Sequence, residues 1–218
     1  MLSDDDILFI AEEMRQHPRL YLLSDEIYES MVVGDTKHRA PASIPGIEDR
    51  VITVGGFSKA HFMTGWRIGY VHAPATVTRA MLTIHEHINT NTAAFIQQAA
   101  LAALDGNRDH IGNYVRKLRE RKIIYDRLLS RSPYLSGTEY EGGYFTFINI
   151  SASRMDCDTF AVELLDQKNV AIVPGLAFGN NYPDYCRLSF VNQTDVFEEG
   201  VKRILEFMES SAHEKKED

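Results

Sequence analysis

Apolar residues recur at helical spacing near the start of the chain. They are Ile7, Leu8, Ile10, Ala11 and Met14. Positions three and four apart share one face of a helix, so this pattern predicts an amphipathic helix within residues 3–16. Ser3 followed by Asp6 resembles a capping box at its start, and Pro18 marks its end.

Three apolar segments follow that are too short for helices. They are "LYLLSDEIYE" (20–29), "RVITVGG" (50–56) and "WRIGYVHAP" (66–74). The first is apolar until it ends in acidic and polar residues, which is typical of a parallel strand buried on both faces. Two or three strands with one leading helix cannot cover the faces and edges of such a sheet. The pattern therefore predicts that another segment, on a partner or on a longer chain, completes it.

The remainder of the chain is helical first and mixed afterwards. Residues 76–104 form a helical pattern broken near "NTNT", and residues 109–131 predict a long charged helix. Further strands are predicted at 142–150, 170–175 and 185–191, with helices at 158–168 and 195–210 and a polar, disordered tail at 212–218. We therefore expect an α/β domain over 1–105, a linking helix over 106–131 and a small α+β domain over 132–218.

Composition narrows the classes of partner. The formal charge is −8 and the chain is 44% hydrophobic, so a broad basic surface for nucleic acid is not expected. No apolar run is long enough to cross a membrane, and the acidic start is unlike a secretory signal, so we predict a cytoplasmic protein. Cys157 and Cys186 are expected to be reduced and packed, and "HEH" at 85–87 to be ordinary helix, with no metal site.

Polar and charged residues follow two of the predicted strands. Asp25 and Tyr28 come after the first strand, Lys59 comes after the second, and Arg67 lies beyond a turn that contains Gly65. Parallel strands bring their carboxyl ends to one edge of a sheet, where ligands bind, so these four side chains are expected to converge. Taken alone, Asp25 and Tyr28 also fit a strand-end turn and a packed aromatic ring.

Three motifs resemble the class I and II aminotransferases, which are pyridoxal-phosphate enzymes of fold type I. "SKAHFMTGWRIGY" is similar to the family's cofactor-lysine signature, and "SDEIYE" to the segment that touches the cofactor ring. "VAIVPGLAFGNNYPDYCRLSF" resembles the C-terminal segment that ends in an arginine for the substrate carboxylate. The motifs fall in family order. They imply the C-terminal part of the mostly parallel large domain, followed by the small α+β domain.

The resemblance implies a role for each cofactor residue. Lys59 would bind pyridoxal 5′-phosphate as a Schiff base and then move the substrate proton. Asp25 would keep the pyridine nitrogen protonated, Tyr28 would hydrogen-bond the ring's phenolic oxygen, and Arg67 would bind the phosphate. Ser58 either contacts the phosphate or caps the following turn, and the two readings are balanced.

Arg187 is implied as the ligand of the substrate's α-carboxylate. It lies in an apolar strand, where an unpaired guanidinium is costly, so it needs an anion, either the substrate or a buried salt bridge. Tyr182 and Tyr185 are expected to pack. Gly56 stands where many relatives have serine or threonine, which removes one expected phosphate contact.

The chain lacks the motifs that the family carries upstream: a phosphate-binding turn, a stacking aromatic and an asparagine segment. The resemblance therefore implies a C-terminal portion, and residues 1–218 alone are expected to bind the cofactor weakly and turn over poorly. The predicted reaction is amino-group transfer between an amino acid and a 2-oxo acid. Another pyridoxal-phosphate reaction, such as a β-lyase or synthase, and a non-catalytic regulatory module are the alternatives. Family members are usually homodimers, and residues 89–92 resemble a segment that reaches the neighbouring subunit.

Overall fold

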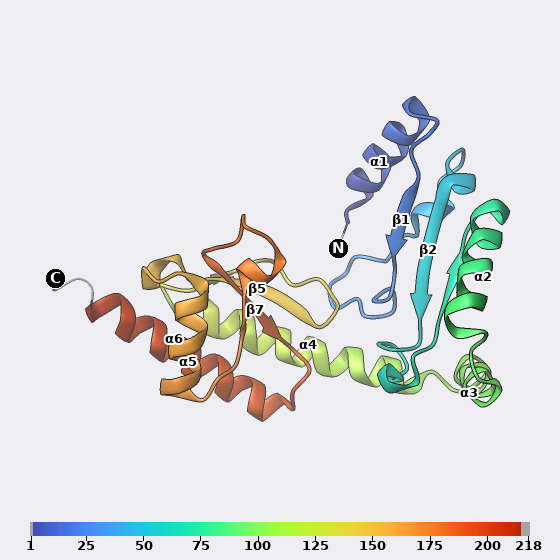
Figure 1. The fold of residues 1–218 in the computed structure, drawn as a ribbon. Helices are drawn as coiled ribbons and strands as arrows, with labels where there is room; N and C mark the ends of the chain where they lie inside the picture. Colours follow the sequence, from blue (N-terminus) through green and yellow to red (C-terminus); the bar gives the residue numbers. More distant parts are fainter. Residues whose placement is uncertain (1, 215–218) are drawn as a thin grey trace. The chain divides into compact units, whose positions relative to one another are not determined.

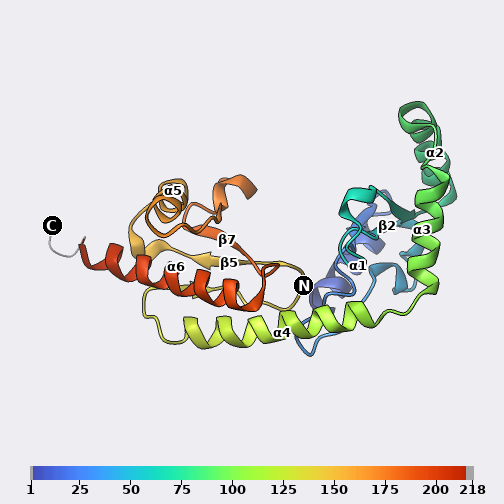
Figure 2. The same cartoon turned by 90° about the horizontal axis from the view of Figure 1, so that it is seen from below.

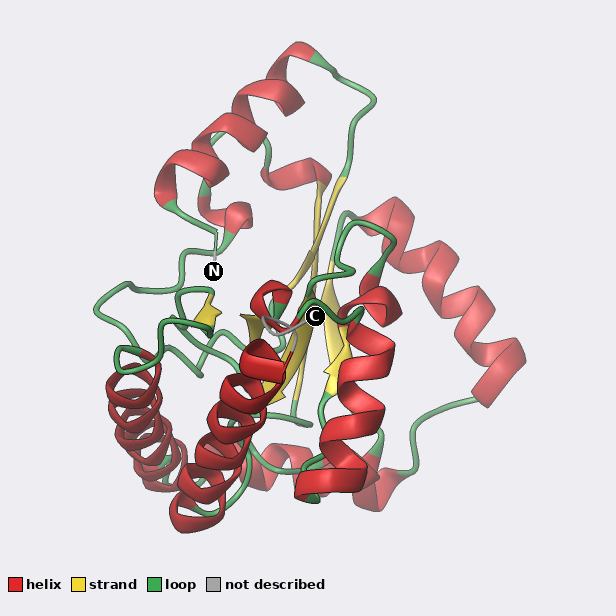
Figure 3. Cartoon of the chain, turned by 90° about the vertical axis from the view of Figure 1, so that its left-hand side faces the viewer, coloured by secondary structure: helices red, strands yellow, loops and turns green. Residues whose placement is uncertain are grey.

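The computed structural model describes residues 2–214, which form two compact units that divide between Asn113 and Tyr114. α-Helices are the most abundant regular structure, and the strands are short (Figure 3). The division falls inside α4 (Asp109–Leu129), the helix that the sequence marks as a linker. The predicted domain boundaries at 105/106 and 131/132 stay predictions.

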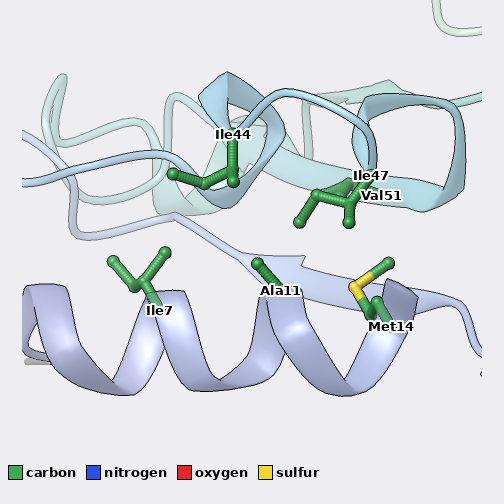
Figure 4. Close-up of a cluster of buried hydrophobic side chains, with 6 residues drawn as sticks. All are labelled: Ile7, Ala11, Met14, Ile44, Ile47 and Val51. Carbon is green, nitrogen blue, oxygen red and sulfur yellow. The ribbon is translucent and has the colours of Figure 1, made fainter. Parts of the chain in front are cut away.

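The first unit begins with α1 (Asp4–Gln16), and its predicted capping box is confirmed. The Asp6 N–H donates to Ser3 Oγ at 3.1 Å, and the Ser3 N–H donates to Asp6 Oδ2 at 2.9 Å. The buried face of α1 packs on the loop segment that precedes β2 (Val51–Gly56) (Figure 4). This cluster consists of Ile7, Ala11, Met14, Ile44, Ile47 and Val51.

Arg50 closes the C-terminal end of α1. Its Nη1 donates to the carbonyl oxygens of Met14, His17 and Leu20, at 2.5, 3.0 and 3.3 Å. The last carbonyls of a helix have no partner within the helix, so one guanidinium satisfies several of them.

Replacing Arg50 by methionine should lower the free energy of unfolding of the first unit by about 1.5–3 kcal/mol, because charge-assisted hydrogen bonds are lost. Trp66 is the single tryptophan and lies in this unit, so denaturant unfolding followed by its fluorescence measures the change. Arg19→Met, at an exposed position, is the matched control and should stay within about 0.5 kcal/mol of the parent protein. Equal effects of the two substitutions would contradict this role for Arg50.

The sheet of the first unit has the order β1–β2–β3, with β1 at Leu22–Asp25 and β3 at Gly69–His72. β1 and β2 are parallel, whereas β2 and β3 are antiparallel. Residues 57–68 join β2 to β3 through turns and a short 3₁₀ segment, without the crossover helix that a parallel pair usually needs. The α/β class is as expected: β1 and β2 form a parallel pair, and β3 is the one antiparallel strand of this sheet.

Two helices complete the first unit, α2 (Ala75–Asn89) and α3 (Ala94–Asp105). The break between them falls at the predicted "NTNT" segment, and "HEH" at 85–87 lies inside α2 as expected. Among residues 2–214, none of the helices has the length and apolar character needed to cross a membrane.

The second unit is an α+β arrangement with a four-stranded antiparallel sheet of order β4–β5–β7–β6. The strands are β4 (Ser136–Gly137), β5 (Phe145–Asn149), β6 (Val173–Pro174) and β7 (Tyr185–Ser189). Helices α5 (Cys157–Lys168) and α6 (Thr194–Glu214) pack together beside the central strands (Figures 1 and 2). β6 is shorter than the predicted 170–175, because only Val173 and Pro174 pair with β7.

Helix α6 continues past the predicted end at residue 210. Ala212 is buried and follows Met208 by four positions, so it extends the apolar face of the helix. The prediction of an unpacked tail is therefore wrong for Ala212, and residues 215–218 lie outside the described residues.

Candidate active site

Asp25 is the last residue of β1 and lies at the carboxyl end of that strand. The Ile27 N–H donates to Asp25 Oδ1 at 3.2 Å, which is the strand-end turn that the sequence allowed. This bond fixes the carboxylate and uses one of its oxygens. Within the described part of the chain, Oδ2 has no hydrogen bond, so one acceptor remains available to a ligand.

Lys59 and Tyr28 are brought together, as the strand pairing predicted. β1 and β2 run parallel, with Asp25 opposite Val54, so the turns that follow both strands lie at one edge. Lys59 Nζ is 5.7 Å from the centroid of the Tyr28 ring, and both side chains are half-buried. A primary amine therefore lies over a phenol beside the end of the sheet.

Arg67 reaches the same edge from β3, whose Gly69 lies opposite Gly56 of β2. Its backbone adopts the left-handed conformation, with φ 52° and ψ 47°, and its Nη1 donates to the Thr64 carbonyl at 2.9 Å. The predicted turn does contain Gly65, which lies in the short 3₁₀ segment Thr64–Trp66, and its positive φ angles fall on Phe62 and Arg67. A positive φ angle is energetically unfavourable for a non-glycine residue, and residues in such conformations cluster at functional sites.

Two glycines of β2 allow close packing. A Cβ on Gly55 would lie 2.4 Å from the Tyr70 ring, so only glycine leaves room for that ring. A Cβ on Gly56 would lie 3.2 Å from the Cα of Gly69, where the two strands touch. Gly56 is thus explained by strand packing.

Ser58 begins the turn that carries Lys59. Its side chain makes no hydrogen bond within residues 2–214. A capping role would need such a bond, so the structure gives no support to the capping reading, and the hydroxyl is available to a ligand.

A contact of the residue that follows Asp25, between the buried Glu26 and the half-buried His38, was missed by sequence reasoning. The carboxylate of Glu26, which is 6% exposed, lies 2.7 Å from His38 Nε2 and accepts from Thr53 Oγ1 at 3.4 Å. This pair supports the end of β1 next to Asp25. His38 lies in an irregular loop, so no periodic pattern connects it with the strand.

His61 follows Lys59 by two positions. Burial lowers the pKa of His61, and the nearby His110 and Arg108 lower it further. Its Nδ1 is buried without a hydrogen-bond partner among the described residues. Both effects favour the neutral imidazole at this position beside Lys59.

Arg187 belongs to β7 of the second unit. Its guanidinium Cζ lies 4.0 Å from the Phe145 ring centroid and 5.0 Å from that of Phe178. Nε is buried without a partner, and no salt bridge reaches Arg187 in the described part of the chain. The predicted alternative of a buried salt bridge is therefore wrong within residues 2–214. Two aromatic faces hold a guanidinium that still needs an anion.

Tyr182 and Tyr185 pack as predicted. Their rings lie 6.3 Å apart edge to face, and both contact Phe147, with centroids 5.8 and 6.4 Å away. Cys157 and Cys186 are buried free thiols, as expected.

The first unit thus holds a carboxylate, a phenol, an amine and a guanidinium at one edge of its sheet, and the second unit holds an unpaired arginine. The family model described as aminotransferase class I and II matches residues 1–204. The chain belongs to this family, whose members depend on pyridoxal phosphate.

Individual relatives agree with this assignment. The aspartate aminotransferase of Musicola paradisiaca is 37% identical over 207 residues, which are 94% of this chain and 52% of that protein. The aspartate aminotransferase of Geobacillus stearothermophilus is 34% identical, with 94% and 55% covered. A solved aromatic aminotransferase from Pyrococcus horikoshii superposes with a TM-score of 0.91 at 31% identity and covers 96% of this chain and 56% of that one. The chain spans about half the length of the relatives that it matches.

The residues present fit pyridoxal phosphate. An aldehyde suits the Lys59 amine, a pyridine nitrogen suits the remaining oxygen of Asp25, and a phosphate suits the exposed Arg67 fork beside the unbonded Ser58 hydroxyl. The ring of Tyr28 adds a phenolic donor close to the amine.

Proposed function

We propose that this chain contributes the cofactor lysine and the substrate arginine of an enzyme that transfers an amino group from an amino acid to a 2-oxo acid. The observation that carries the proposal is the approach of Lys59 Nζ to the Tyr28 ring, at 5.7 Å, beside the carboxylate that ends β1. Family membership supports it.

Lys59 is the proposed covalent attachment point of pyridoxal phosphate, through a Schiff base. When bound, that cofactor supplies an electron sink for the negative charge that develops at the substrate Cα. Lys59, once its amine is free, takes the proton from this carbon and later returns one during transfer. Asp25 keeps its partner nitrogen protonated, because a carboxylate favours a neighbouring positive charge. Tyr28 donates a hydrogen bond from its phenolic O–H to the phenolic oxygen of the cofactor ring, close to the Lys59 amine.

The two arginines act as anchors. Arg67 binds the phosphate, since a planar guanidinium presents several donors to a dianion, and Ser58 adds a hydroxyl. Arg187 binds the α-carboxylate and so fixes the substrate Cα in one orientation. Phe145 and Phe178 restrict its rotation, so less side-chain entropy is lost when the substrate binds.

Product analysis tests the reaction type. The chain is joined to the half of the Musicola aspartate aminotransferase that it does not match, and it is supplied with pyridoxal phosphate, 2-oxoglutarate and single amino acids. We expect glutamate and the corresponding 2-oxo acid in equal amounts. Release of ammonia without glutamate would indicate a lyase and contradict the proposal, as would the absence of any turnover by a folded, cofactor-loaded protein.

Further properties remain proposals from the sequence. They are a cytoplasmic location, a homodimeric whole enzyme, and partners limited to the amino acid and 2-oxo acid, without nucleic acid or membrane.

A further inference from the structure

We propose that His61 is a positioning residue for Lys59, because its neutral imidazole holds the turn that carries this lysine in one conformation. This segment, the lysine turn, comprises residues 57–63 and follows β2 directly. Protonation of His61 releases the turn, so the position of the Lys59 amine depends on pH. The inference rests on the proposed function only in taking Lys59 as the cofactor lysine.

The lysine turn is closed by a few backbone hydrogen bonds. The N–H groups of His61 and Met63 both donate to the Phe57 carbonyl, at 3.2 and 3.3 Å. The Phe62 N–H donates to the Lys59 carbonyl at 3.4 Å. These distances lie at the long end of the range for N–H···O bonds, so the backbone alone holds the turn weakly. Side-chain contacts therefore contribute to its conformation.

The ring of His61 makes such contacts with two neighbours. Its centroid lies 5.4 Å from that of Phe57, inside the turn, and 5.4 Å from that of His110, near the start of α4. Phe57 is 5% exposed and packs with α3 in a buried cluster. His110 is held in turn, since its Nδ1 lies 3.3 Å from the Asn107 carbonyl oxygen. The His61 imidazole thus connects the lysine turn to the start of α4 within the first unit.

These contacts suit the neutral imidazole. His61 Nδ1 is buried and has no hydrogen-bond partner among the described residues. A neutral imidazole can keep its hydrogen on Nε2 and leave Nδ1 without one, whereas the imidazolium carries hydrogens on both nitrogens. Protonation therefore places a charged donor at Nδ1 without an acceptor, which is costly at a buried atom.

The surroundings of His61 also oppose a positive charge. Burial lowers its pKa below the ordinary value of 6.5, and the charges of His110 and Arg108 lower it further. A histidine whose pKa is lowered by packing favours the packed conformation above about pH 6.5. That preference is lost as the pH falls through the lowered pKa, so acid should open the lysine turn.

The other elements beside the turn offer no charge that compensates an imidazolium. The Asp109 carboxylate accepts a hydrogen bond from Asn107 Nδ2 at 2.6 Å, and no ion pair joins His61 to a carboxylate within residues 2–214. On β3, Tyr70 contacts Phe57, and burial raises the pKa of this phenol, which therefore stays neutral. The residues of α3 that pack on the turn are alanines.

Hydrogen exchange measures the turn directly, in the full chain and without cofactor. After correction for the intrinsic effect of pH, protection of the His61 and Met63 amides should fall about threefold or more between about pH 7.5 and pH 5. His61→Phe keeps a ring on Phe57 and cannot be protonated, so its protection should not depend on pH. His87→Phe, at an exposed position of α2, removes another histidine and should behave like the parent chain.

Capture of the cofactor measures the effect on Lys59. The chain is incubated with pyridoxal phosphate and cyanoborohydride at each pH, and modification of Lys59 is divided by that of the exposed Lys37, because this ratio removes the effect of pH on the reagents. We expect the ratio to fall about threefold or more from about pH 7.5 to pH 5 in the parent chain, and to stay within about twofold in His61→Phe. His61→Arg carries a fixed positive charge and should lower the ratio already at about pH 7.5.

The outcomes are distinguishable from a failure to fold and from a failure of the proposed function. Trp66 fluorescence shows whether each variant keeps the first unit folded. Equal pH dependence of the turn amides in the parent chain and in His61→Phe would overturn the inference. Equal ratios of Lys59 to Lys37 modification in these two proteins at every pH would overturn it as well. If Lys59 is modified at no pH, the proposed function fails, and hydrogen exchange, which needs no cofactor, decides the inference by itself.

Discussion

Replacing Lys59 by arginine should remove the main site of covalent capture of pyridoxal phosphate. The chain is incubated with the cofactor and reduced with borohydride, and the modified lysine is located by peptide mass spectrometry. In the parent chain we expect Lys59 to react at the lowest cofactor concentrations, because it lies beside Tyr28 and at the same sheet edge as Arg67. Arginine keeps the charge and cannot form the link.

A control lysine distinguishes the capture of the cofactor at Lys59 from the non-specific reaction of surface lysines. Lys37 is exposed in a loop of the same unit, so Lys37→Arg should leave the modification of Lys59 unchanged. Arg67→Gln should raise the cofactor concentration needed for half-modification by about tenfold, since a charge-assisted hydrogen bond is lost. Equal modification of Lys37 and Lys59 at every cofactor concentration would contradict a cofactor-binding site at Lys59.

Replacing Phe190 by alanine should destabilise the second unit by about 3–5 kcal/mol, since it removes a fully buried aromatic ring. Phe190 is 0% exposed and stacks on Tyr140 with 3.9 Å between centroids, and Tyr125 and Phe197 lie 5.4 and 4.8 Å away. Its carbonyl accepts from the buried Arg121 at 2.6 Å. The cavity left behind would remove packing from all three rings.

Hydrogen exchange of the α6 and β7 amides measures this change in the second unit. Val191→Ala is the matched control at the next position, which is 45% exposed, and its effect should stay within about 0.5 kcal/mol. A loss below about 1 kcal/mol for Phe190→Ala would show that the ring is not the centre of this core.

Local patterns were enough to predict most elements. Helical spacing predicted α1, and Ser3 and Asp6, three positions apart, predicted its capping box, because both features depend on residues close in sequence. The apolar run that ends at Asp25 predicted β1, and the parallel pairing with β2 then implied that Tyr28 and Lys59 meet. The order of the three motifs along the chain indicated the family.

Contacts between distant residues were outside the reach of such patterns. The pairing of Glu26 with His38 depends on the path of the loop between them, which no periodic pattern of apolar residues predicts. The left-handed conformation falls on Phe62 and Arg67, which no local pattern marked, because the tertiary path from β2 to β3 sets those angles. The packing of Ala212 required the neighbouring core to extend α6.

The sequence by itself predicted most of the helices and strands, since these follow from local spacing, and it proposed the residues of the candidate site from the residue types at strand ends. Only the tertiary structure decided that Arg187 lies against two aromatic rings, and that its Nε and both edges of the first sheet have no partner among the described residues. Strand neighbours and buried partners are chosen by the free energy of the whole packed arrangement, to which residues far apart in the chain contribute together.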